Sequence, residues 1–273
     1  MGSMVTKRFR FIRFNADWRR IGYQFVGLAV ALALWQLFTS QFFMTEQFSR
    51  GFSPASTFRE LRQFVIGGAL LHHAIPSLQR VGLGLLIATL AGIPIGLLVG
   101  YFKVFNLITN TVFQFIRMTS PLAWMPLAII VFGVGNKPVC FLIAVAAVWP
   151  IVINTAHGVR SVNPIWVKVV RMLGGHHAGV LRRAVVPAII PDMLTGLRIS
   201  LGISWIILVP AEMLGVSSGL GYYILDTRDR FNYGELMAVI LVVGFLGFIS
   251  DVLIRLVQRK CSWRLETING LVV

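Results

Sequence analysis

Long apolar runs dominate the chain, and short polar or basic segments separate them. Several runs reach the roughly 20 residues that an α-helix needs to cross the hydrocarbon core of a bilayer. The alternating segments of about ten residues that are typical of a membrane β-barrel do not occur in these runs. The pattern therefore predicts an all-α membrane protein with six transmembrane helices. The predicted spans cover residues 21–43, 79–101, 104–133, 139–157, 193–215 and 235–257.

The segments between the spans differ in character. Residues 44–78 and 216–234 are mixed and polar, and the first of these predicts an external segment with a short amphipathic helix near 57–72. Residues 158–192 form a basic loop with helical character. In the second span, Gly92, Gly96 and Gly100 recur every four residues, which favours close helix packing in lipid. The third span is broken at Pro121 and Pro126, so we expect a kink there.

Composition and charge agree with a membrane protein and orient it. Hydrophobic residues make up 56% of the 273 residues and charged residues 13%, against about 25% charged in a soluble domain. The 25 Lys and Arg outnumber the 10 Asp and Glu, and most lie in alternate segments between the spans. The positive-inside rule then places both termini in the cytoplasm. The expected organisation is a basic cytoplasmic tail over 1–20, a membrane domain over 21–258 and a second cytoplasmic tail over 259–273. This distribution assigns the positive charge to membrane topology, with no nucleic-acid partner.

The usual signatures of catalysis and cofactor binding are missing from the sequence. No phosphate-binding G-x-x-x-x-G-K-[ST] loop occurs, and no Ser, His and Asp arrangement stands out. His72–His73 and His176–His177 are adjacent pairs, which point to different sides of a helix and lack the spacing of a zinc site. We therefore expect no catalytic residue, metal or cofactor in this chain. Transport is the expected function.

The loop between the fourth and fifth spans carries a recognisable motif. A helical stretch is followed by a glycine and, thirteen positions later, by a proline. The motif residues are Lys168, Val169, Val170, Gly174, Ala184, Val186 and Pro187. They resemble the cytoplasmic E-A-A, three residues, G, nine residues, I-x-L-P loop of binding-protein-dependent ABC importer permeases. Lys168 departs from the acidic residue of that pattern, Val169 and Val170 from its alanines, and Ala184 and Val186 from its Ile and Leu.

Other segments resemble the same family in the same order along the chain. They are Arg117 to Pro126, Phe132 to Gly135, Trp149 to Gly158, Thr195 to Arg198, and Ala211–Glu212. The resemblance covers about residues 65–260 and is closest to the nitrate, bicarbonate, taurine and alkanesulfonate branch. It implies a type I importer permease of the bacterial inner membrane, for a small oxyanion with nitrate or nitrite first among the candidates. The implied partners are membrane lipid, a second permease copy, two ATPases that bind ATP and Mg²⁺, and an external binding protein.

A secondary anion transporter or channel that works without an ATPase is the alternative function. Such folds often carry two similar halves with paired broken helices. The chain shows no second copy of its proline-broken third segment.

The resemblance assigns coupling to the ATPase to the loop over residues 158–192. Gly174 permits a tight turn, and prolines 187 and 191 are expected to fix where the fifth span starts. Between them, residues 176–183 predict a short helix that lies across the membrane axis. An interfacial helix whose arginines face lipid phosphates is the alternative. The expected coupling residues are Gly174, His176, His177, Leu181, Arg182 and Pro187.

Polar residues inside the apolar runs are candidates for a translocation path, because a polar or charged group in hydrocarbon is costly. A cationic, hydroxyl-rich lining suits a small oxyanion. The candidates are Gln114, Arg117, Thr119, Ser120, Asn154, Arg198, Ser200, Ser204 and Glu212. For the two arginines the alternative is that they extend to the cytoplasmic interface. Glu212 is expected to sit outside the narrowest part of the path or to pair with a cation.

Overall fold

The computed structural model describes residues 18–39 and 51–269, and these residues form helices and connecting turns without a β-strand. The tails over 1–17 and 270–273 lie outside the described residues. In chain order the helices are α1 (Trp18–Phe38), α3 (Pro54–Ile66), α4 (Ala69–Tyr101), α5 (Lys103–Met118), the 3-10 turn η1 (Pro121–Trp124), α6 (Met125–Phe132), α7 (Asn136–Ser161), α8 (Pro164–Met172), α9 (His177–Val180), the π-helical turn η2 (Leu181–Val185), α10 (Val186–Gly215), α11 (Leu220–Asp229) and α12 (Tyr233–Asn269).

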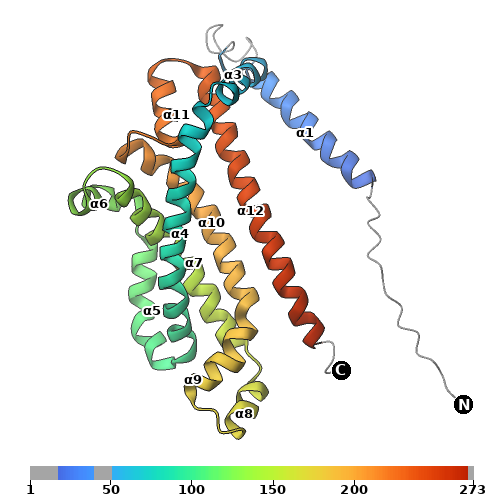
Figure 1. The fold of residues 1–273 in the computed structure, drawn as a ribbon, viewed down its shortest axis with the longest axis vertical. Coiled ribbons are helices and arrows are strands. Elements are labelled where there is room, and N and C mark those ends of the chain that lie inside the picture. Colours follow the sequence, from blue (N-terminus) through green and yellow to red (C-terminus); the bar gives the residue numbers. More distant parts are fainter. Residues whose placement is uncertain (1–17, 40–50, 270–273) are drawn as a thin grey trace, which may run out of the picture.

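The long helices run along the length of the molecule and divide it into two ends (Figure 1). Helices α3 and α11 gather at one end, which we call the α11 end, and α8 and α9 lie at the other, the α8 end. Helix α7 is the centre of the bundle and packs against α4 on one side and α10 on the other. Its Leu142, Ile143 and Ile151 are almost fully buried, together with Leu208 of α10. Helix α1 stands beside this bundle (Figure 1).

Four helices in the described part of the chain are long and apolar enough to cross a membrane. They are α4, α7, the continuous helix His177–Gly215 and the long part of α12, Tyr233–Cys261. Helix α5 and the segment Pro121–Phe132 pass the same test together as a fifth, with a bend of 86° between them. The expected break at Pro121 is therefore confirmed. The apolar described part of α1, Phe25–Phe38, is shorter than a full span, so the count of six stays a prediction.

Two helix boundaries correct the expectation. Helix α4 begins at Ala69, ten residues before the expected start of the second span, and it continues through Pro76. The chain turns into it at Gly68, whose φ of 74° is in the left-handed region that favours glycine. The expected amphipathic helix near 57–72 is α3, which begins earlier because Ser53 caps its N-terminus and Pro54 occupies its first turn. It ends at the Gly67–Gly68 pair.

The fifth span also differs from the expectation. Prolines 187 and 191 were expected to mark its start, and residues 176–183 to form a separate crosswise helix. The structure instead continues from His177 to Gly215 without a separating loop. Pro187 lies in the first turn of α10 and Pro191 inside it. The π-helical turn Leu181–Val185 directly before them provides the altered hydrogen-bond pattern through which a helix accommodates proline. Residues 177–183 are therefore the first part of this continuous helix, and the expectation of a separate helix is wrong.

The glycines of α4 allow the close approach of α7, as the sequence predicted. A Cβ atom built on Gly96 would lie 2.6 Å from the Cβ atom of Thr155 and 2.9 Å from the carbonyl oxygen of Val152. Gly92 and Gly100 meet α7 in the same way. Gly82, on the same helix, has open space around it. The two helices therefore touch through backbone, which is the packing that small residues permit in lipid.

We expect Gly96→Leu to destabilise the chain by about 1–3 kcal/mol or more, because overpacking forces two helices apart. Gly82→Leu is the matched control, since its side chain would enter open space. The midpoint of thermal unfolding in detergent measures both. Equal midpoints for the two variants would contradict the packing role of Gly96.

Candidate translocation site

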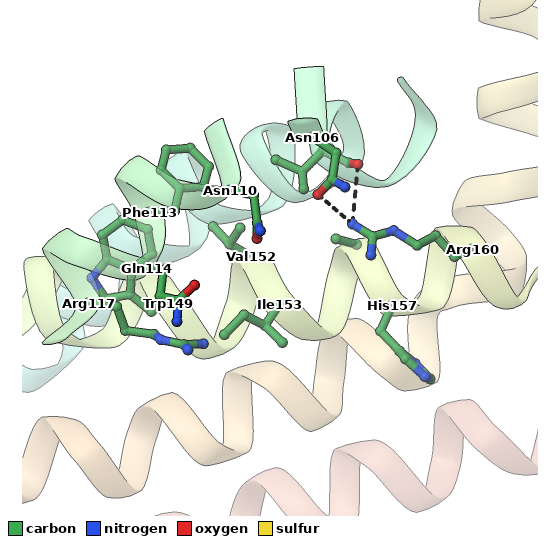
Figure 2. A pocket seen from close by; sticks show the side chains of 12 residues that line it. Asn106, Asn110, Phe113, Gln114, Arg117, Trp149, Val152, Ile153, His157 and Arg160 are labelled. Carbon is green, nitrogen blue, oxygen red and sulfur yellow. Dashed lines mark hydrogen bonds between the residues drawn. The ribbon is translucent and has the colours of Figure 1, made fainter. Parts of the chain in front are cut away.

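A polar cavity of about 310 Å³ lies between α5 and α7 (Figure 2). It is lined by Val99, Asn106, Asn110, Phe113, Gln114, Arg117, Trp149, Val152, Ile153, Ala156, His157 and Arg160. The lining combines three amides, two guanidinium groups and one imidazole with apolar and aromatic side chains. No Asp or Glu is among these residues. The cavity therefore offers hydrogen-bond donors and positive charge.

The sequence of α5 explains why its polar groups line one side of this cavity. Asn106, Asn110 and Gln114 are spaced by four residues and Arg117 follows three later, so they share one helix face. Leu107, Ile108, Val112 and Phe115 are exposed apolar side chains on the rest of the helix. A helix with one polar stripe at membrane depth has to face protein or a water-filled space with that stripe.

The two arginines of the cavity have no carboxylate partner among the described residues. Arg160 donates through one nitrogen to Asn106 Oδ1 at 3.0 Å and to the carbonyl oxygen of Val99 at 3.5 Å (Figure 2). Other arginines of the long helices are paired: Arg198 and Arg255 both contact Asp251, at 2.7 Å and 2.5 Å. Since arginine stays charged at any physiological pH, the cavity keeps uncompensated positive charge.

The structure brings Gln114 and Arg117 of the sequence-predicted path into this cavity. Thr119 and Ser120 lie next along the chain, in the bend between α5 and η1, where the Thr119 hydroxyl donates to the carbonyl oxygen of Phe115 at 3.4 Å. Asn154 is on α7 but is not among the lining residues, and its side chain donates to the carbonyl oxygen of Pro150 at 2.8 Å.

The candidates on α10 lie away from the cavity. Ser200 is fully buried between helices and donates to the carbonyl oxygen of Ala147 at 2.5 Å. Ser204, also buried, donates to the carbonyl oxygen of Ser200 at 2.8 Å. Arg198 joins α10 to α12 through Asp251. Ser200 and Arg198 thus join α10 to α7 and α12, while the Ser204 hydroxyl is engaged within α10 itself.

Glu212 belongs to a buried polar cluster at the α11 end of the bundle. Its carboxylate forms an ion pair with Arg80 of α4, and the two side chains are 0% and 2% exposed. The Ser77 hydroxyl donates to the same carboxylate at 2.8 Å, and the backbone N–H of Gly221 donates to it at 2.8 Å. Of the two positions expected for Glu212, the structure shows the pairing with a cation.

Arg80 extends this cluster to α7 and to the segment before α11. Its Nε atom donates to Asn136 Oδ1 at 2.9 Å, and its two terminal nitrogens donate to the carbonyl oxygen and hydroxyl of Ser218 at 2.7 and 3.0 Å. A Cβ atom on Gly219 would lie within 2.5 Å of Arg80 and Glu212 atoms. The φ angle of Gly219 is 117°, a conformation that favours glycine. We call Ser77, Arg80, Asn136, Glu212 and Ser218 the α11-end cluster. It fastens α11 to α4, α7 and α10.

Sequence reasoning missed Arg80, although a signal was present. It is an arginine at the start of a glycine-rich apolar run, and Glu212 is an acid in another apolar run. A buried charge needs an opposite charge and further hydrogen bonds. Because each is a charged residue in an apolar run and the two charges are opposite, a contact between Arg80 and Glu212 could have been predicted.

Tyr223 completes the attachment of α11 beside this cluster. Its hydroxyl donates to Glu235, and its ring stacks on His73 with centroids 4.4 Å apart. Burial, together with the hydrogen bond to Glu235, raises the pKa of Tyr223 above its usual value. The phenol therefore stays protonated and acts as a donor.

The expected coupling residues lie at the α8 end. Gly174 has a φ of 79° and forms the turn between α8 and α9, as expected. His177 contacts the hydroxyl of Tyr101 with its Nδ1 atom at 2.9 Å, which links α9 to the end of α4. His176 and Arg182 are exposed and Leu181 is half-buried, while Val180 and Val185 pack into a small apolar cluster. Pro187 begins α10.

The short helix of this loop that turns separate from both neighbouring spans is α8, which carries Lys168, Val169 and Val170 of the motif. Val167 and Val170 pack against the same apolar cluster as Val180. Met172 and Leu173, at the far end of α8, are 86% and 83% exposed. The loop thus presents an apolar tip with basic residues around it.

Fold and cavity together define a multi-pass membrane protein of the transport class. The family model for the inner membrane component of binding-protein-dependent transport systems matches residues 92–263. The chain belongs to this family. It is therefore an inner-membrane ABC importer permease, a class that works with ATPase and substrate-binding partners.

Curated relatives place the chain in the nitrate, bicarbonate and sulfonate branch. It is 35% identical over 246 residues to the bicarbonate transport system permease protein CmpB of Synechococcus elongatus, with 85% of this chain and 86% of the relative covered. It is 33% identical over 267 residues to the putative aliphatic sulfonates transport permease protein SsuC of Bacillus subtilis, with 96% of each covered. It is 35% identical over 184 residues to the nitrate import permease protein NrtB of Leptolyngbya laminosa, with 67% and 66% covered.

Solved structures confirm the type I permease fold. A chain of the MetNI methionine ABC transporter in an inward-facing conformation matches with a TM-score of 0.61 at 13% identity, and 69% of this chain and 94% of that chain are covered. A chain of an amino acid ABC transporter matches with a TM-score of 0.54 at 18% identity, covering 77% and 97%.

Proposed function

We propose that the chain forms the translocation path of an ATP-driven importer for a small oxyanion, with nitrate or nitrite first and bicarbonate, taurine and alkanesulfonates next. The observation that carries this proposal is the cavity between α5 and α7, which holds two arginines and three amides and no carboxylate. Fixed donors and cations stabilise an anion in a site of low dielectric constant. The relatives are named for the transport of bicarbonate, nitrate and aliphatic sulfonates, which all belong to this substrate class.

The proposal includes a second copy of the permease. The polar stripe of α5 is open in the single chain, with Asn110, Gln114 and Arg117 exposed. Contact of this stripe with lipid would be costly. Two copies around a two-fold axis would enclose the stripes of both chains in one water-filled path.

The proposal also includes the orientation of the chain in the membrane and its coupling to the ATPases. The α8 end is cytoplasmic, because Arg160, Lys168, Arg171, Arg182 and Arg183 lie in the elements there. This orientation agrees with six spans and with both tails, 1–20 and 259–273, inside. The loop over 158–192, with its coupling residues, contacts two ATPases that bind ATP and Mg²⁺, while this chain has no ATPase site. An external binding protein delivers the anion to the α11 end.

Arg117→Gln is expected to lower uptake at limiting substrate at least tenfold, because one lost charge-assisted interaction amounts to about 1.5–3 kcal/mol. The assay is uptake of labelled nitrate, bicarbonate and taurine, each in turn, by proteoliposomes with the complete transporter. Arg117→Lys is the matched control, since it keeps the charge and should keep a larger part of the uptake.

Thr119 and Ser120 remain in the proposed path because they adjoin Arg117 at the bend. Full uptake by Arg117→Gln with an assembled complex would contradict the path. It would favour the alternative that Arg117 only extends to an interface.

A further inference from the structure

The cavity has two cationic ends. On α5, Asn106 pairs with Arg160 of α7, and eleven residues later Arg117 lies at the other end of the stripe. Between them Phe113 contacts Trp149 of α7, with ring centroids 5.4 Å apart. Residue numbers increase along α5 while those of the contacting residues on α7 decrease, so the two helices run antiparallel. At 1.5 Å per residue, the two ends of the stripe are about 16 Å apart.

Arg160 does more than extend to a membrane surface. Its Nη2 atom is held by Asn106 and by the Val99 carbonyl oxygen, and both of these residues line the cavity with it. These two neutral acceptors fix the guanidinium without cancelling its charge. His157 lies one turn before Arg160 on α7, but its ring points away from Arg160 (Figure 2) and its Nδ1 atom is 3.9 Å from Oδ1 of Asp192 on α10. The α8 end of the cavity thus presents an oriented guanidinium and an amide, while the imidazole of His157 faces a carboxylate.

The stretch between the two arginines is neutral. Asn110 and Gln114 each offer an amide that donates and accepts hydrogen bonds. Such groups solvate a moving anion without binding it as strongly as a guanidinium does. Rapid transport needs binding that is favourable at entry but weak enough, or divided over enough sites, for release. Two cations separated by neutral amides satisfy this requirement.

We propose that Arg160, held by Asn106, forms a second oxyanion site at the α8 end of the cavity, which receives the anion from Arg117 and releases it on the side of α8. This inference rests on the proposed function and adds a site that the sequence did not predict. Arg160 is a binding residue for the anion, and Asn106 positions its guanidinium.

The test measures how strongly each arginine attracts an anion, with thiol reagents as probes. Cys140 and Cys261 are first replaced, Cys140→Ala and Cys261→Ser, in the assembled transporter in detergent. Asn110→Cys then places a thiol one helical turn from Asn106, and Gln114→Cys places one three residues before Arg117. Each thiol is reacted with sulfonatoethyl methanethiosulfonate, an anion, and with its trimethylammonium analogue, a cation. The ratio of the two rates reports the local potential.

Arg160→Gln is expected to lower the anion-to-cation rate ratio about fivefold or more at position 110 and much less at position 114. Arg117→Gln should lower the rate ratio strongly at position 114 and much less at position 110. Arg160→Lys is the matched control. It changes the hydrogen bond to Asn106 but keeps the positive charge, and because the charge sets the rate ratio, the ratio at position 110 should be retained. A purely structural role of Arg160 would give equal losses for Gln and Lys.

The outcomes separate the second site from the proposed function. If Arg160→Gln leaves both ratios unchanged while Arg117→Gln lowers the ratio at position 114, the second site is overturned and the path at Arg117 stands. If neither thiol prefers the anionic reagent in the parent protein, the cavity does not attract anions. Both the second site and the oxyanion path through this cavity are then overturned.

Discussion

Replacing Arg80 or Glu212 alone is expected to lower the midpoint of thermal unfolding by about 6–20 °C. Removing one partner of a buried ion pair leaves an uncompensated charge and costs about 3–5 kcal/mol. For a chain of this size each kcal/mol shifts the midpoint by about 2–4 °C. Arg80→Gln also removes the partner of Asn136 and two hydrogen bonds to Ser218. The loss should therefore be at the upper end of this range.

The buried thiol of Cys140 provides the measurement. Cys140 is 8% exposed, so a thiol-reactive fluorescent dye reacts with it when the bundle opens. Cys261→Ser removes the other, partly exposed thiol. Arg228→Gln is the control, because it breaks an exposed pair with Asp229 that is expected to contribute at most about 1 kcal/mol.

The double variant Arg80→Met with Glu212→Leu distinguishes pairing from general disruption. Replacing both charges by apolar side chains of similar size is often close to neutral. We therefore expect the double variant to be more stable than either single variant. Additive losses would show that Arg80 and Glu212 act through separate contacts.

The spans were predictable because hydrophobicity along the chain is a local property. The apolar runs at 79–101 and 139–157 lie inside α4 and α7, and the glycines at 92, 96 and 100 meet α7 as expected. The ends of the helices were less predictable. Whether a helix continues through Pro76 or Pro191 depends on contacts with other helices, which outweigh the local preference of proline.

The site was predictable only where one helix carries it. Gln114 and Arg117 share a face of α5, and the sequence predicted both, but it missed Asn110 and Asn106, which lie one and two turns earlier on the same face. Arg160 and His157 were missed because they join the cavity through packing of α7 on α5. Arg198 was expected on the path as a cation in an apolar run, and its pairing with Asp251, 53 residues away in the sequence, was not foreseen. Pairing between distant residues decides which polar groups stay available to a ligand.

Met172→Glu together with Leu173→Glu is expected to lower binding-protein-stimulated ATP hydrolysis more than tenfold. These side chains form the exposed apolar tip of α8, and α8 carries the motif residues at 168–170. A stable contact with an ATPase would bury this tip, and exposed apolar residues grouped in this way are typical of interaction sites. Burying two new carboxylates in such a contact is costly.

The change should act on coupling and leave the permease folded. Neither side chain is buried in the single chain, so the midpoint of thermal unfolding should shift by no more than about 2 °C. Met172→Leu, which keeps the apolar surface, is the matched control and should retain ATP hydrolysis.

Arg182→Glu tests the other part of the loop, because Arg182 is exposed on η2 while its neighbours Val180 and Val185 are buried. If α8 is the main contact, Arg182→Glu lowers stimulated ATP hydrolysis less than the change at the α8 tip does. A larger loss for Arg182→Glu would assign the contact to residues 176–183 instead. Normal stimulation both in the double variant Met172→Glu with Leu173→Glu and in Arg182→Glu would show that neither the tip of α8 nor Arg182 contributes to the ATPase contact.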